Sequence, residues 1–80
     1  MRKAFFEALN GSLKYDFGPD VFIICAIMHL PGVKGDGLSY EIILTGGELI
    51  AFIKEFAPTH TDIIGKIDPN ASYSLNAWDW

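Results

Sequence analysis

Residues 46–56 carry the clearest pattern of apolar and polar positions in the chain. Apolar side chains recur there at three- and four-residue spacing, at Leu49, Phe52, Ile53 and Phe56. This spacing places them on one face of an α-helix. Thr45 and Glu48 have the spacing of a capping box, in which each side chain bonds the backbone N–H of the other residue. Because Pro58 disfavours a helix beyond Phe56, we predict a helix over 46–56.

Four other segments have the composition of β-strands. Leu13, Tyr15 and Phe17 alternate with charged residues, which is typical of a strand with one buried face. Residues 38–44, 62–67 and 73–78 also predict strands. The sequence Asp-Pro-Asn-Ala-Ser at 68–72 is rich in turn-forming residues and predicts the turn between the last two strands.

Residues 2–10 permit two interpretations. In a helix, Phe5, Ala8 and Leu9 share one side, and Asn10-Gly11 supplies a left-handed C-terminal stop. In a strand, Asn10-Gly11 is instead the turn of a hairpin leading into residues 12–17. That hairpin places favourable pairs opposite each other, Phe6 with Tyr15 and Glu7 with Lys14. The strand leaves Phe5 and Leu9 on the solvent face, so we favour the helix.

The run from Val21 to Leu30 is almost entirely apolar and dense in β-branched residues. We interpret it as a strand covered on both faces, or one whose second face meets a partner. The loop at 31–37 is short, so this strand would pair antiparallel with residues 38–44. Pro19, just before the run, makes a buried helix the alternative.

These elements define one domain over residues 1–80, because 80 residues leave room for no second core. We predict an α+β fold with two layers. An antiparallel sheet of four to five strands would form one layer, and one or two helices packed on it would form the other.

Composition narrows the class of protein. Half of the residues are hydrophobic, which excludes a disordered chain, and a net charge of −4 argues against direct binding to nucleic acid or an anionic membrane. The longest apolar run has ten residues, against about 20 for a membrane-spanning helix. No signal-peptide core follows the basic start, so we expect a cytoplasmic protein. The single cysteine allows no internal disulfide.

Candidate chemistry is sparse. Cys25 with His29 or His60 is the only thiolate–imidazole pair available, and the apolar surroundings of Cys25 predict a buried, unreactive thiol. No pattern of Cys and His fits a metal site, and Gly46-Gly47 lacks the lysine of a phosphate-binding loop. We therefore expect no catalytic residue, no metal and no cofactor, and hence no enzyme.

The apolar content exceeds what a small core can bury, which points to an interaction surface. A domain of this size buries roughly 60–65% of the surface of its unfolded chain. We expect the remainder to gather near the C-terminus and to bind a protein partner or a second copy, with acids around it. The candidate partner-binding residues are Tyr73, Trp78, Trp80, Asp16, Asp20, Asp36 and Glu41.

In size, acidity and α+β layout, the chain resembles the small proteins that phages encode to block bacterial immunity, such as anti-CRISPR proteins. The resemblance rests on no motif and assigns no residue. It implies a non-enzymatic inhibitor that acts in the host cytoplasm by binding and blocking a larger protein, with its acids toward a basic groove. The alternative is an oligomeric small-ligand-binding protein, or a minor enzyme, with a pocket between subunits.

Overall fold

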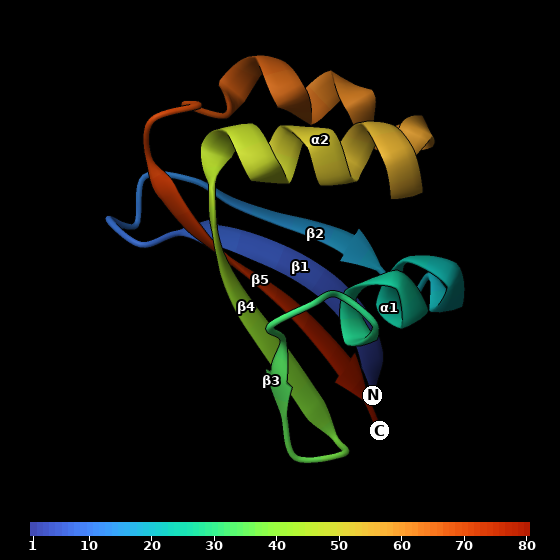
Figure 1. Ribbon diagram of the computed structural model, residues 1–80. Coiled ribbons are helices and arrows are strands. Elements are labelled where there is room, and N and C mark those ends of the chain that lie inside the picture. The colour runs from blue at the N-terminus through green and yellow to red at the C-terminus, as the bar shows by residue number, and fades with distance from the viewer.

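The computed structural model describes residues 1–80 and contains one antiparallel sheet of five strands in the order β2-β1-β5-β4-β3. The helices lie together on one side of this sheet (Figure 1). In chain order, the elements are β1 (Arg2–Ala8), β2 (Lys14–Gly18), α1 (Val21–Met28), β3 (Lys34–Gly35), β4 (Ser39–Thr45), α2 (Gly46–Phe56), the 3₁₀ helix η1 (Pro58–Lys66) and β5 (Ser72–Asp79). The predicted two-layer α+β class is confirmed.

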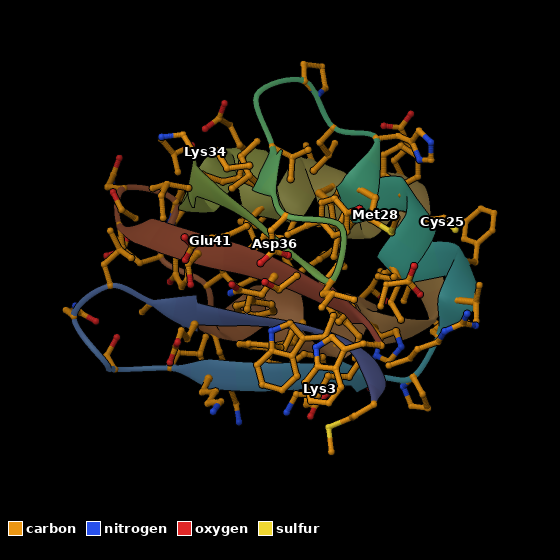
Figure 2. The ribbon with its side chains drawn as sticks, turned by 90° about the horizontal axis from the view of Figure 1, so that it is seen from below. Lys3, Cys25, Met28, Lys34, Asp36 and Glu41 are labelled. Atoms are coloured by element: carbon orange, nitrogen blue, oxygen red, sulfur yellow. The ribbon has the colours of Figure 1, made fainter.

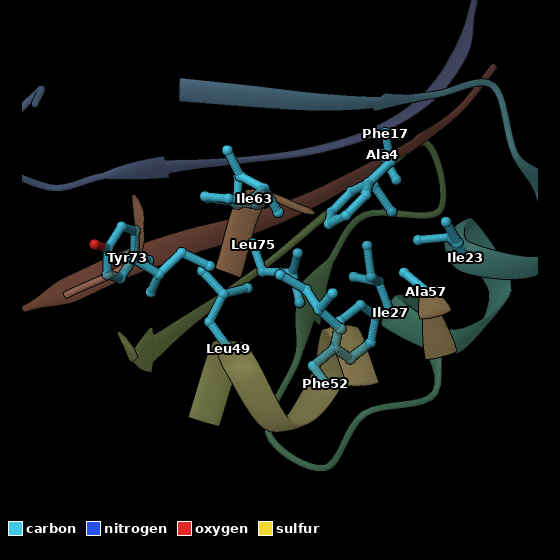
Figure 3. Close-up of a cluster of buried hydrophobic side chains, with 14 of the residues drawn as sticks. Ala4, Phe17, Ile23, Ile27, Leu49, Phe52, Ala57, Ile63, Tyr73 and Leu75 are labelled. Carbon is cyan, nitrogen blue, oxygen red and sulfur yellow. The ribbon is translucent and has the colours of Figure 1, made fainter. Parts of the chain in front are cut away.

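The core fills the space between the sheet and its helices (Figure 3). Strand β5 is central, and its residues Tyr73, Leu75 and Ala77 point toward the helices and are buried. Leu49 and Ile53 of α2 and Ile27 of α1 meet them from the other layer. Ser74, Asn76 and Trp78 alternate with the buried residues along β5 and lie on the second face of the sheet. No helix covers that face (Figure 1).

Residues 2–8 form a strand, so the helix favoured for this segment is wrong. Asn10-Gly11 is the turn of a hairpin, with Gly11 at a φ of 76°, and Phe6 lies opposite Tyr15. The strand pairs with β2 on one side and β5 on the other. The hydrogen bonds to both neighbouring strands stabilise the extended backbone of β1. Phe5, which the predicted helix would have buried, lies on the face of the sheet away from the helices, where side chains from other strands cover it.

Val21–Met28 form a helix, so the predicted strand and its pairing with 38–44 are also wrong. Asp20 supplies the missing signal, because its carboxylate accepts hydrogen bonds from the backbone N–H groups of Phe22 and Ile23, at 2.9 and 3.1 Å. An aspartate in this place caps a helix N-terminus. The helix buries Ile23, Ile24 and Ile27 against the sheet.

The strand predicted at 62–67 is part of the 3₁₀ helix η1 instead. Ile63 of η1 and Ile67, the residue that follows η1, are buried. In a 3₁₀ helix residues three apart share a face, whereas a strand places residues four apart on one face, so the spacing of Ile63 and Ile67 by itself favours a strand. The segment pairs with no strand of the sheet and packs beside α2 instead.

The junction of β4 and α2 confirms the capping box. Glu48 N–H donates to the Thr45 hydroxyl at 3.1 Å, and Thr45 N–H donates to the Glu48 carboxylate at 2.9 Å. The helix ends at Phe56, two residues before Pro58. The strands predicted at 13–17, 38–44 and 73–78 are confirmed within a residue or so of their bounds.

We expect Thr45→Ala to lower the free energy of unfolding by about 1 kcal/mol, because the Glu48 N–H loses its acceptor. Urea denaturation measures the change, and Thr45→Ser, which keeps the hydroxyl, is the matched control. An unchanged midpoint for Thr45→Ala would show that the hydroxyl contributes nothing to the helix.

Candidate interaction surface

The side of the sheet away from the helices, here the open face, carries one set of alternating residues from every long strand. Phe5 of β1 lies opposite Asn76 of β5, which lies opposite Glu41 of β4. The strand residues on this face are Lys3, Phe5, Glu7, Lys14, Asp16, Ser39, Glu41, Ile43, Ser74, Asn76 and Trp78. Seen from this side in Figure 2, the sheet has no helix over it.

Three aromatic residues pack together on the open face, and we call Phe5, Trp78 and Trp80 the tryptophan cluster. The rings of Phe5 and Trp78 meet edge to face with centroids 5.2 Å apart, and Trp80 stacks on Trp78 at 5.9 Å. Phe5 is only 7% exposed, whereas Trp80 is 56% exposed. The cluster therefore buries its base and presents one indole to solvent.

Lys3 fixes the cluster from the side of β1 (Figure 2). Its ammonium lies 4.9 Å from the centre of the Trp78 ring, 5.0 Å from that of Phe5 and 3.4 Å from the Asp16 carboxylate. A cation over an aromatic ring is attracted by the ring quadrupole, whose faces carry partial negative charge. Because Asp16 pairs with the Lys3 ammonium, the negative charge of Asp16 is partly balanced within the open face.

A shallow hollow of about 380 Å³ lies next to the tryptophan cluster, at the end of the sheet formed by the β3–β4 hairpin. Trp78 and Asn76 of β5 line one wall of the hollow, and Lys34, Asp36 and Glu41 lie around it (Figure 2). Glu41 is exposed and has no ion pair within 4 Å. The hollow thus combines an indole wall with charges of both signs.

Asp36 organises the hairpin beside this hollow. Its carboxylate accepts hydrogen bonds from the backbone N–H groups of Ser39 and Leu38, each at 2.9 Å. These bonds, that of Ser39 above all, hold the pKa of Asp36 below its ordinary value because they favour the charged form. Asp36 therefore carries a full negative charge at neutral pH.

The structure gathers five of the seven predicted partner-binding residues on or beside the open face: Asp16, Asp36, Glu41, Trp78 and Trp80. The other two do not join them. Asp20 is engaged as the cap of α1. Tyr73 lies in the core with 2% exposure, and its hydroxyl accepts a hydrogen bond from Asp68 N–H. Tyr73 faces the helices because it alternates with Ser74 along β5.

Phe5 and Lys3 were not among the seven predicted partner-binding residues. They reach the open face because β1 is a strand paired with β5, which sets Lys3 opposite Trp78. The available signal was the alternation of residues 3–8 under the hairpin interpretation, which leaves Phe5 on the solvent face. Phe5 does lie on that face, but Trp78 covers it.

No three His, Cys, Asp or Glu side chains gather into a group suited to a metal ion. Cys25 is exposed, so the predicted burial of its thiol is wrong; as a helical residue it points away from the sheet. His29 Nδ1 lies 2.8 Å from the Cys25 carbonyl oxygen, which can only accept, so this nitrogen is a donor and not a base for the thiol.

None of the helices is long and apolar enough to cross a membrane. Comparisons of the chain with models of protein families, with curated proteins and with solved structures gave no match.

Proposed function

We propose that the protein is a non-enzymatic interaction protein that binds a larger protein through the open face, with Trp80 and Trp78 as its anchors. One observation carries this proposal. Trp80 is 56% exposed yet stacked on Trp78, over a sheet face that no helix covers. A lone exposed tryptophan needs no explanation, but one held in a cluster on an uncovered sheet face is well placed for contact with a partner.

The energetics of interfaces favour these residues as anchors. Tryptophan is enriched among the few residues that dominate binding, because it buries a large rigid area and keeps one hydrogen-bond donor. Stacking on Trp78 restricts the Trp80 ring before a partner arrives, so less side-chain entropy is lost on binding. The surrounding polar residues would then form the rim that excludes water.

The proposed partner carries a basic groove. The protein inhibits this partner by occluding the groove, the mode of action that the resemblance to phage-encoded inhibitors implies. Asp36 and Glu41 support this choice, since both are exposed beside the tryptophan cluster and neither has an ion pair within 4 Å. Complementary charge at the rim speeds association and selects the partner more than it adds affinity. Asp16 contributes less, because Lys3 already neutralises it.

We expect Trp80→Ala to weaken binding to the partner at least about 30-fold, the loss typical of an interface hot spot. The substitution spares the fold because Trp80 follows the last residue of β5. The wild-type protein first captures its partner from lysate for identification by mass spectrometry. The affinity of the purified pair is then measured for Trp80→Ala and for a control, Leu9→Ala.

Leu9 is a suitable control because it is exposed to a similar extent, 58%, in the β1–β2 turn. Binding that Leu9→Ala leaves intact and Trp80→Ala abolishes supports the proposal. If no protein is captured stoichiometrically, or if Trp80→Ala binds as tightly as the wild type, the open face is not the binding surface.

A further inference from the structure

Strand β2 forms an unpaired edge of the sheet. It bonds β1 on one side, and no strand lies on the other. β2 has five residues, whereas β3, the strand at the opposite edge, has two. In Figure 2, β2 is the outermost ribbon on its side of the sheet, and no helix crosses its outer edge. Such an edge presents backbone N–H and C=O groups that can pair with another strand.

The outward backbone groups of β2 belong to Lys14 and Asp16. The Ala8 N–H donates to the Leu13 carbonyl at 2.8 Å, which sets the phase of the ladder between β1 and β2. Bonded and non-bonded residues alternate along an antiparallel pair, so Tyr15 also bonds β1. Lys14 and Asp16 therefore direct their N–H and C=O groups away from the sheet, and no turn or loop hydrogen bond uses these groups.

We propose that this edge is the interface of a symmetric homodimer, in which the β2 strands of two copies pair antiparallel about a two-fold axis at Tyr15. In this register, Lys14 of each copy lies opposite Asp16 of the other, and each such pair exchanges two backbone hydrogen bonds. The five strands of each copy then join into one continuous antiparallel sheet. An isologous contact needs one self-complementary patch, and the outward groups of β2 supply it.

The side-chain charges of the edge favour a second copy as its occupant. The side chains of Lys14 and Asp16 both lie on the open face, so the register places opposite charges beside each other twice. Within each copy, Glu7 lies opposite Lys14, and the Lys3 ammonium is 3.4 Å from the Asp16 carboxylate. Across the contact the charges therefore alternate in sign, in the order Glu7, Lys14, then Asp16 and Lys3 of the second copy. Opposite charges on facing residues stabilise a pair of strands.

The same charges select the register. A shift of two residues in either direction would place two copies of Lys14, or two copies of Asp16, directly opposite each other on the axis, which is destabilising. A shift of one residue would turn the second sheet over, because side chains alternate between the faces. Asp20, the first charged residue after β2, lies toward residues 9–12 of the second copy, and that turn carries no charge.

The contact is short, so the dimer is weak. Two strands of five residues bury less than the roughly 1,600 Å² of a standard interface, and we expect a dissociation constant on the order of 10–100 µM. This inference goes beyond the proposed function. The register keeps the two open faces on one side of the continuous sheet, so the dimer presents two tryptophan clusters to a partner at once, and bivalent binding increases the apparent affinity.

Sedimentation velocity from about 5 to 500 µM, a range that brackets the expected dissociation constant, tests the dimer. The wild type should move from the mass of one chain to that of two. Lys14→Glu should remain monomeric, because it places two acids opposite each other in both pairs. Lys54→Glu is the matched control: it makes the same change in net charge, from −4 to −6, at an exposed residue of α2, and should dimerise like the wild type.

A mixture of two variants separates the proposed pairing from a loss of folding. Asp16→Lys alone should also remain monomeric, because lysines then face each other. An equimolar mixture of Lys14→Glu and Asp16→Lys should form a heterodimer at least about tenfold tighter than either variant with itself, since the acids of one lie opposite the lysines of the other. A mixture that stays monomeric overturns the proposed register.

Amide hydrogen exchange locates the contact. At 500 µM, the Asp16 N–H of the wild type should exchange at least about threefold more slowly than that of Lys14→Glu, because the dimer gives this group an acceptor. A wild type that stays monomeric at every concentration overturns the proposal. So does a dimer that Lys14→Glu leaves intact, or one that Trp80→Ala abolishes, since that dimer would use the tryptophan cluster.

Discussion

Phe6→Ala is expected to lower the free energy of unfolding by about 3–5 kcal/mol, the usual cost of emptying a buried aromatic site. Phe6 is fully buried on β1, and its ring lies within 6 Å of the rings of Tyr15, Phe17 and Tyr73. Removing it leaves a cavity among aromatic side chains that cannot all move in. An 80-residue domain has a total stability of roughly 4–12 kcal/mol, so the variant stands near its unfolding threshold.

Leu9→Ala is the matched comparison, with an expected change below about 0.5 kcal/mol because Leu9 is exposed. Together the two variants separate the strand from the helix predicted for residues 2–10, since that helix buries Leu9. Urea denaturation followed by tryptophan fluorescence measures both midpoints. A larger loss for Leu9→Ala than for Phe6→Ala would contradict the strand and the sheet order built on it.

Gly46→Ala is expected to destabilise the protein by about 3 kcal/mol, at the upper end of the cost of overpacking. Gly46 is buried at the start of α2, where its N–H donates to the Ala71 carbonyl at 2.8 Å. A Cβ on Gly46 would overlap the backbone carbonyl of Asp68 and approach Pro69. These atoms belong to the turn that leads into β5, so relief of the clash requires one of two backbones to shift.

Gly47→Ala provides the control one residue further along. A Cβ there makes only ordinary contacts, with its nearest neighbours 3.9 Å away, and the backbone is helical. Alanine also costs less entropy than glycine in a helix, so we expect no loss of stability and a gain of up to about 1 kcal/mol. Thermal denaturation of the two variants measures the difference. Equal melting temperatures would refute the close approach of the two backbones.

Local signals in the sequence determined α2, the turn at 68–72 and the strands β2, β4 and β5. Each depends on contacts between residues close in the chain. The capping box joins Thr45 to Glu48, and the alternation of β2 needs only one buried face. These short-range preferences favour the same structure as the tertiary packing, so the elements that they specify could be predicted from the sequence.

The candidate site was predicted in part for a similar reason. Trp78 and Trp80 were identified by residue type and by their position at or just after the end of a predicted strand, and they do form a cluster. The partners that make it a surface, Phe5 and Lys3, come from the far end of the chain. Their contribution depends on the pairing of β1 with β5, which no local pattern specifies.

Tertiary structure decided the remaining elements, with the local Asp20 cap as an additional contribution to α1. Residues 2–8 and 21–28 are apolar enough for either a strand or a helix, and periodicity does not distinguish them over so few turns. Pairing on both edges stabilises β1 as a strand, and the Asp20 cap with packing of three isoleucines stabilises α1 as a helix. The exposure of Cys25 follows from that helix. The free energy of these segments is set by long-range contacts, and those exist only once the sheet has formed.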